Sequence, residues 1–220
     1  MIFEQYAVIF DVDGVLIDSG PIHYKSWKKL ADEIGIPFTK QYFDDSFGKQ
    51  GIPTLRNIVG KNISEKQLLE WVELKEVYYR EMVKNKLIAM PGVITLIKEL
   101  KENSFKLAVA TSGPPENTDL LLKTIYIDQF FDQIITAADI KKGKPAPDIF
   151  LMVSKNLNIL PKNCLVIEDA PVGIEAAKKA GMKCIALTTT YEVSKLNNAD
   201  MIIDSLSEIN TYDIIELIKL

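Results

Sequence analysis

The chain has 220 residues, of which 47% are hydrophobic and 25% are charged, a composition typical of a soluble globular protein with a sizeable core. Acidic residues outnumber basic ones by 30 to 26 and the basic residues form no long run, which argues against nucleic acid as a partner. No stretch approaches about 18 uninterrupted apolar residues, which excludes a membrane-spanning helix. The first residues lack the basic segment that opens a secretory signal, so we expect a cytoplasmic protein.

Short, apolar, β-prone runs recur along the chain and predict buried strands. They cover residues 7–10, 107–110, 133–135, 165–167, 184–187 and 201–203. Helical patterns lie between them, at residues 93–100, 116–125, 147–157 and 172–180, with Pro147 in a first helical turn and Gly181 at a helix C-terminus. Because strand and helix alternate, we expect an α/β fold with a mostly parallel sheet covered on both faces.

The segment between the first two predicted strands breaks this alternation. It contains no convincing strand and instead shows helical patterns at residues 21–34, 42–47, 53–59 and 64–86, the last opening with the capping-box pattern of Ser64 and Gln67. An all-helical insert directly after a first strand is typical of a cap or lid. We therefore predict an α/β core of residues 1–17 and 88–220 and a helical cap of residues 18–87, with hinges at 17–20 and 87–92.

Polar residues stand where the predicted strands end. In open parallel sheets, ligands bind beyond the carboxyl ends of the strands. The residues found there or beside a following helix are Asp11, Asp13, Thr111, Ser112, Lys144, Glu168 and Asp169. Carboxylates from two strands would repel one another, and a hard divalent cation such as Mg²⁺ would neutralise them. A lysine with a hydroxyl or backbone N–H group beside that cation forms a site for a phosphate dianion.

The spacing of these acids suggests a role for each. Asp11 ends its strand and stays ionised beside a metal, so it can attack phosphorus as a nucleophile. Asp13 leaves the strand through the Gly14 turn and can return over the site as general acid and then general base, with its backbone carbonyl as a possible metal ligand. We expect Asp169 to hold the metal, with Glu168 as a further candidate ligand.

The motifs that carry these residues resemble those of the haloacid dehalogenase superfamily. Residues 11–19 look like its first motif, residues 111–112 like the second, residues 143–148 like the third and residues 168–173 like the fourth, in this order. The resemblance implies a Rossmann-like core with a helical cap, an aspartyl-phosphate intermediate and dependence on Mg²⁺. It is strongest to the β-phosphoglucomutase-like group of small sugar-phosphate phosphatases and mutases.

Three residues of the predicted cap are candidates for contacts with substrate. His23, the single histidine, stands where the resemblance implies a contact with the acid/base region, and a hydrated surface histidine is the alternative. Lys49 and Lys75 could face the cleft, but the helical pattern favours a solvated helix face for both.

One departure from the family pattern bears on the reaction. Phosphoglucomutases of this type bind a second phosphate through a cap arginine and a lysine after the second motif, and the matching positions here are Gly51 and Pro114, with Lys49 near enough to stand in. This favours hydrolysis of a small phosphate ester over β-phosphoglucomutase or related phosphotransferase activity. A non-catalytic binding module and a dehalogenase rank lower. We expect a monomer or weak homodimer.

Overall fold

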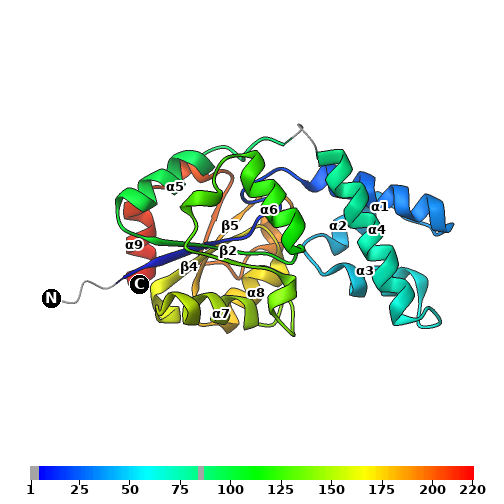
Figure 1. The fold of residues 1–220 in the computed structure, drawn as a ribbon. Coiled ribbons are helices and arrows are strands. Elements are labelled where there is room, and N and C mark those ends of the chain that lie inside the picture. Colours follow the sequence, from blue (N-terminus) through cyan, green and yellow to red (C-terminus); the bar gives the residue numbers. More distant parts are fainter. Residues whose placement is uncertain (1–4, 84–86) are drawn as a thin grey trace.

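The computed structural model describes residues 5–83 and 87–220 and contains one sheet with helices on both faces (Figure 1). Its six strands run parallel in the order β3–β2–β1–β4–β5–β6. They are β1 (Ala7–Phe10), β2 (Lys106–Ala110), β3 (Gln133–Ile135), β4 (Cys164–Glu168), β5 (Lys183–Leu187) and β6 (Met201–Ile203). The predicted α/β fold is confirmed, because a parallel sheet needs crossover helices and these bury both of its faces.

Alternate residues of the central strand β1 enter different apolar clusters, as the two-residue period of a strand requires. Val8 and Phe10 pack with α5 (Val93–Glu102), α6 (Pro115–Thr124) and α9 (Thr211–Lys219). On the opposite face, Ala7 and Ile9 pack with α7 (Asp148–Leu157) and α8 (Pro171–Lys179). In the strand order, β2, β1 and β4 are neighbours at the middle of the sheet, where the order reverses direction. Their carboxyl ends therefore lie next to one another.

Helices α1 (Gly20–Ile34), α2 (Lys40–Ser46), α3 (Gly51–Val59) and α4 (Glu65–Val83) lie beyond the carboxyl ends of the strands (Figure 1). They enclose an apolar cluster of their own, built from Trp27, Leu30, Ala31, Phe38, Phe43, Leu55, Leu68 and Tyr78. This is the predicted helical insert. Residues 84–86 of the predicted last helix lie outside the described residues, and the boundaries of the cap at residues 18 and 87 stay a prediction.

Helix ends differ in detail from the sequence predictions. Pro147 precedes α7 as its N-terminal cap and is not in its first turn. The Ser64 hydroxyl accepts a hydrogen bond from the Gln67 backbone at 3.2 Å, whereas the Gln67 side chain donates to Glu70, so only half of the capping box forms. Gly181 follows α8 with a φ of 73°, the left-handed backbone that favours glycine after a helix. Among the helices of the described ranges, none is both long and apolar enough to cross a bilayer.

Candidate active site

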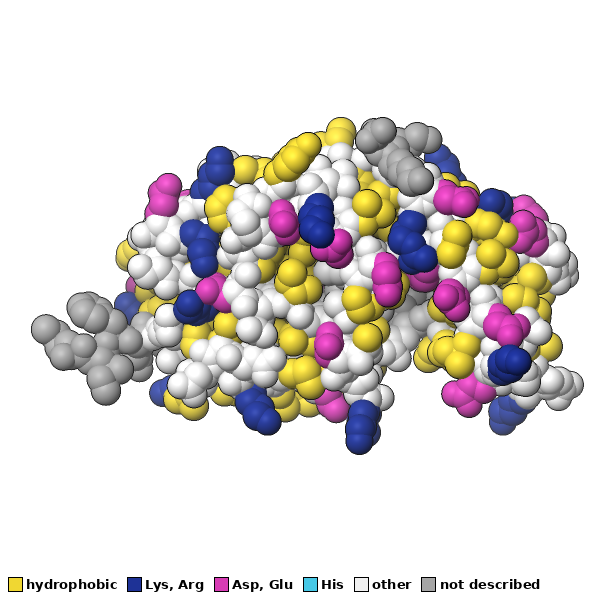
Figure 2. Space-filling model, viewed as in Figure 1, with side chains coloured by type: hydrophobic (Ala, Val, Ile, Leu, Met, Phe, Trp, Pro, Cys, Tyr) yellow, Lys and Arg dark blue, Asp and Glu magenta, His cyan; other side chains and the backbone are white. Residues whose placement is uncertain are grey.

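The backbone ladder of the sheet fixes two of the predicted site residues. The Asp11 N–H group donates to the Ile167 carbonyl at 3.0 Å, and the Thr111 N–H group donates to the Ile135 carbonyl at 3.1 Å. Each residue therefore extends its strand by one position and points its side chain beyond the sheet edge. Asp11, Asp13, Thr111 and Ser112 all line one pocket between core and cap, and the face shown in Figure 2 has a notch between these two parts of the molecule.

Lys144 lies at the centre of the acidic residues. Its ammonium group donates to Asp11 Oδ1 at 2.6 Å, to Glu168 Oε1 at 2.5 Å and to the carbonyl of Ala110 at 3.1 Å. Burial by itself would lower the pKa of Lys144, but the carboxylates of Asp11 and Glu168 outweigh it and raise the pKa. Lys144 is therefore charged, and it neutralises one of the negative charges around it.

Asp11, Glu168 and Asp169 form a buried cluster with more negative charge than Lys144 can balance. Each offers a carboxylate oxygen, and these oxygens lie within 4.8 Å of one another. Burial, together with the charge of Glu168, raises the pKa of Asp169 well above its ordinary value and the pKa of Asp11 to about 7. Such hard oxygen donors with excess charge fit a divalent cation, which would hold the carboxyl groups ionised.

Two glycines allow the backbone to approach these carboxylates closely. A Cβ atom on Gly173 would lie 1.9 Å from Glu168 Oε1, and one on Gly14 would lie 2.0 Å from Asp169 Oδ2. Gly14 also has a φ of 80°. Any other residue at either position would displace a carboxylate of the cluster, so these glycines are part of how the chain shapes the site.

The acidic cluster predicts an unusual dependence of stability on pH. For Asp11, the pKa rises from 3.8 to about 7 on folding, so the folded protein binds more protons between these values than the unfolded chain. In EDTA, we expect the free energy of unfolding to fall as pH rises from about 4 to about 7, and added Mg²⁺ to restore it at pH 8. Urea unfolding at several pH values measures this, and stability that is flat or rises over that range would contradict it.

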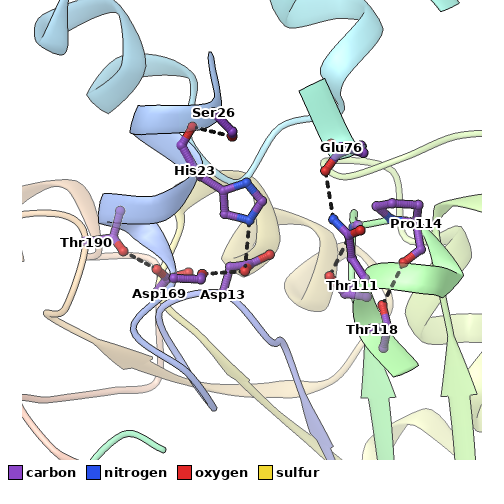
Figure 3. Close-up of polar contacts among 12 residues, drawn as sticks. Asp13, His23, Ser26, Glu76, Thr111, Pro114, Thr118, Asp169 and Thr190 are labelled. Carbon is purple, nitrogen blue, oxygen red and sulfur yellow. Dashed lines mark hydrogen bonds and ion pairs between the residues drawn. The ribbon is translucent and has the colours of Figure 1, made fainter. Parts of the chain in front are cut away.

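Asp13 stands apart from this cluster and faces the cap. Its carboxylate accepts hydrogen bonds from the Ser19 hydroxyl and, at 3.2 Å, from His23 Nε2 (Figure 3). Burial alone would raise the pKa of Asp13, but His23 and Ser19 stabilise the ionised form and the pKa is lowered overall. His23 stacks on the ring of Tyr79 at a centroid distance of 3.9 Å.

For Lys75, the expected solvated helix face is wrong, because its side chain is only 2% exposed. Its ammonium group contacts His23 Nδ1 at 2.8 Å and Glu76 Oε1 at 3.0 Å. The alternative of a hydrated surface position is wrong for His23 as well, since its side chain is 12% exposed. Lys49 does lie exposed as expected, at the edge of the pocket, where it donates to the Asp45 carbonyl at 2.8 Å.

Some residues of the site were not predicted. The Thr190 hydroxyl donates to Asp169 (Figure 3). The Thr189 hydroxyl donates to the Gly14 carbonyl at 2.6 Å. Both threonines follow β5, so the rule that ligands gather at the carboxyl ends of strands would have found them. Thr54 of α3 also lines the pocket, and its buried hydroxyl has no hydrogen-bond partner among the described residues.

Gly51 and Pro114 both line the pocket. Neither residue type has an ionisable side chain, so these two positions supply no charge there. A Cβ atom on Gly51 would lie 2.8 Å from Val72 Cγ1, which means that a longer side chain at this position requires Val72 to move.

On the face shown in Figure 2, acidic and basic side chains are interspersed and no basic patch appears.

Both the sequence and the fold are similar to those of known proteins. Residues 8–187 match the family model described as haloacid dehalogenase-like hydrolase. A phosphorylated carbohydrates phosphatase of Thermotoga maritima is 33% identical over 81% of this chain and 83% of its own length. The β-phosphoglucomutase of Bacillus subtilis is 31% identical over 92% of this chain and 91% of its own. The crystal structure of β-phosphoglucomutase from Clostridium difficile superposes with a TM-score of 0.89 and 30% identity, covering 98% of this chain and 97% of that one. The chain therefore belongs to the haloacid dehalogenase-like hydrolases and is an enzyme of that family.

Proposed function

We propose that the protein is a Mg²⁺-dependent phosphatase that hydrolyses a small sugar phosphate through an aspartyl-phosphate intermediate. The observation that carries this proposal is the pairing of two unlike aspartates at one pocket. Asp11 belongs to the buried cluster around Lys144, whereas Asp13 is held by His23 and Ser19. Two carboxyl groups in different environments can divide the roles of nucleophile and acid/base.

In the first step, an oxygen of Asp11 attacks phosphorus, the ester P–O bond breaks, and the leaving oxygen takes a proton from Asp13. In the second step, Asp13 removes a proton from water, whose oxygen attacks phosphorus and releases inorganic phosphate and the Asp11 carboxylate. Thr111 and Ser112, which line the pocket, and Lys144, which contacts Asp11, would bind the phosphoryl oxygens. The groups that would hold Mg²⁺ are the carboxylates of Asp11, Glu168 and Asp169 and the backbone carbonyl of Asp13. Such an ion would neutralise the negative charge that develops on the phosphoryl oxygens.

The lowered pKa of Asp13 makes it a carboxylate at neutral pH, which is the form that the second step requires. The first step requires a proton on the same group. That proton comes from solvent, and the Nε2–H group of His23, at 3.2 Å, orients the carboxyl group that receives it. Closure of the cap over the pocket would keep water from the phosphoenzyme until the leaving group departs.

β-Phosphoglucomutase is the second candidate, because proteins of that name are among the similar sequences and structures. It needs a site for a second phosphate. Gly51 and Pro114 leave the expected positions uncharged, Val72 fills the space beside Gly51, and Lys49 is exposed at the edge. Hydrolysis of a monophosphate is therefore favoured. We also propose that the protein acts in the cytoplasm, as a monomer or weak homodimer.

A panel of hexose, pentose and hexitol monophosphates and hexose bisphosphates tests the function. We expect Mg²⁺-dependent release of inorganic phosphate from a subset of the monophosphates, with bisphosphates turned over no faster, and loss of turnover in EDTA. β-Glucose 1-phosphate separates the candidates, since a phosphatase yields glucose and phosphate whereas a mutase yields glucose 6-phosphate without net release. No turnover of any ester would overturn both and favour the binding module.

A further inference from the structure

Three polar side chains, Glu76, Arg80 and Asn117, connect the cap to the core across the pocket, and we name them the cap–core bridge. Asn117 lies on core helix α6, whereas Glu76 and Arg80 lie on cap helix α4. Asn117 Oδ1 accepts from Arg80 Nη1 at 2.9 Å, and Asn117 Nδ2 donates to Glu76 Oε2 at 2.7 Å. Because a guanidinium only donates and a carboxylate only accepts, these two contacts fix the orientation of the amide. The Asn117 residue is 3% exposed, so water does not readily replace either bond.

The bridge is one end of a longer row of hydrogen bonds. Glu76 Oε1 accepts from Lys75 at 3.0 Å, Lys75 contacts His23 Nδ1 at 2.8 Å, and His23 Nε2 reaches Asp13 at 3.2 Å. The Asp13 carboxylate only accepts, so Nε2 carries the hydrogen directed at it, and Nδ1 is then the acceptor from Lys75, which also donates to Glu76. Figure 3 shows the two ends of the row, with the contact between His23 and Asp13 on one side and the hydrogen bond of Glu76 on the other.

The two ends of this row belong to the core and its middle belongs to the cap. Asp13 and Asn117 are core residues, whereas His23, Lys75 and Glu76 lie on α1 and α4, which pack together in the cap. A displacement of the cap would therefore break the contacts with Asp13 and Asn117 together. While the cap is closed, Asn117 restrains Glu76, which in turn restrains Lys75 and His23.

The geometry points to Asn117 as a positioning residue that holds His23 against Asp13 when the cap is closed. Asn117 needs no contact with the reacting atoms for this, because it acts through Glu76 and Lys75. The placement of His23 stands on the structure alone, whereas its effect on turnover rests on the proposed role of Asp13 in hydrolysis.

Tyr191 offers a matched control. Its hydroxyl also joins core to cap, donating to the Phe47 carbonyl at 3.0 Å, but that bond ends on the backbone and does not lead to Asp13. Asn117→Leu and Tyr191→Phe thus each remove hydrogen bonds between core and cap, and only the first interrupts the row.

The first experiment is a double-mutant cycle with His23→Gln, read as kcat and KM for phosphate release from a monophosphate ester. We expect Asn117→Leu to lower kcat about tenfold in the wild-type background and less than about twofold in the His23→Gln background. Tyr191→Phe should have the same effect in both backgrounds. Two results would overturn the proposal: an effect of Asn117→Leu that stays the same in the His23→Gln background, or an effect on KM alone. Either would mean that Asn117 contacts the substrate directly or has a purely structural role.

The second experiment does not depend on activity. Because His23 is the single histidine, ¹⁵N-histidine labelling gives one imidazole whose nitrogen resonances report its hydrogen bonds. At pH 7, we expect Asn117→Leu to shift the His23 Nδ1 and Nε2 resonances and Tyr191→Phe to leave them in place. Unchanged resonances in the folded Asn117→Leu protein would overturn the proposal, whether or not the protein proves to be a phosphatase.

Discussion

Replacement of Asp11 by Asn is expected to lower kcat for phosphate release by at least about 1,000-fold, because the amide cannot form the aspartyl-phosphate. Asn has nearly the same shape as Asp, and it removes one of the negative charges that crowd this site. We therefore expect the variant to fold. Steady-state kinetics measure the loss, and an acid quench with ³²P-labelled substrate should trap label on the wild-type protein and none on the variant.

Asp18→Asn is the control for this substitution. Asp18 belongs to the same sequence motif, but its side chain is exposed and does not line the pocket that contains Asp11. We expect Asp18→Asn to retain turnover within about twofold. If Asp11→Asn kept comparable turnover, the nucleophile would have to be another group, and the proposed aspartyl-phosphate would be wrong.

The predicted strands agree with the structure to within one residue at each end, because short β-prone apolar runs are specific for buried parallel strands. Helix α9 was not predicted, although its signals are local and present. Asn210 caps it, Asp213 completes the capping box, and Ile214, Leu217 and Ile218 form the apolar stripe. The local sequence is therefore sufficient to predict this helix, and nothing in the tertiary structure hides it.

The two halves of the site differ in how far the sequence could predict them. Core residues such as Asp11 and Asp169 follow strands, so the topology of a parallel sheet brings them together. Cap residues carry no such constraint. Lys75 occupies a helix position typical of a solvated lysine, and its burial depends on His23, 52 residues away in sequence, and on Glu76, which Asn117 holds from 41 residues away. Local periodicity contains no information about contacts of that range.

Replacement of Lys144 by Met is expected to reduce both stability and turnover, since Lys144 is the buried cation between Asp11 and Glu168. Met keeps most of the side-chain volume but leaves these carboxylates without a partner, and breaking a buried ion pair in this way costs about 3–5 kcal/mol of the free energy of unfolding. Loss of the charge that we propose to bind the phosphoryl group should lower kcat by at least about 100-fold.

The loss of stability in Lys144→Met should itself depend on pH and on Mg²⁺. Without the ammonium group, the carboxyl groups of Asp11, Glu168 and Asp169 repel one another most when all are ionised, so urea unfolding in EDTA should show a larger loss at pH 8 than at pH 5. If Mg²⁺ binds to these oxygens as proposed, it should recover part of the loss at pH 8 without restoring turnover. Lys142→Met is the control, because Lys142 is an exposed lysine of the same loop and its replacement should change stability by no more than about 0.5 kcal/mol. Equal stability of the two variants in EDTA at pH 8 would mean that a group other than Lys144 balances the negative charge of the cluster. Lys144 would then have no electrostatic role in holding the folded site together.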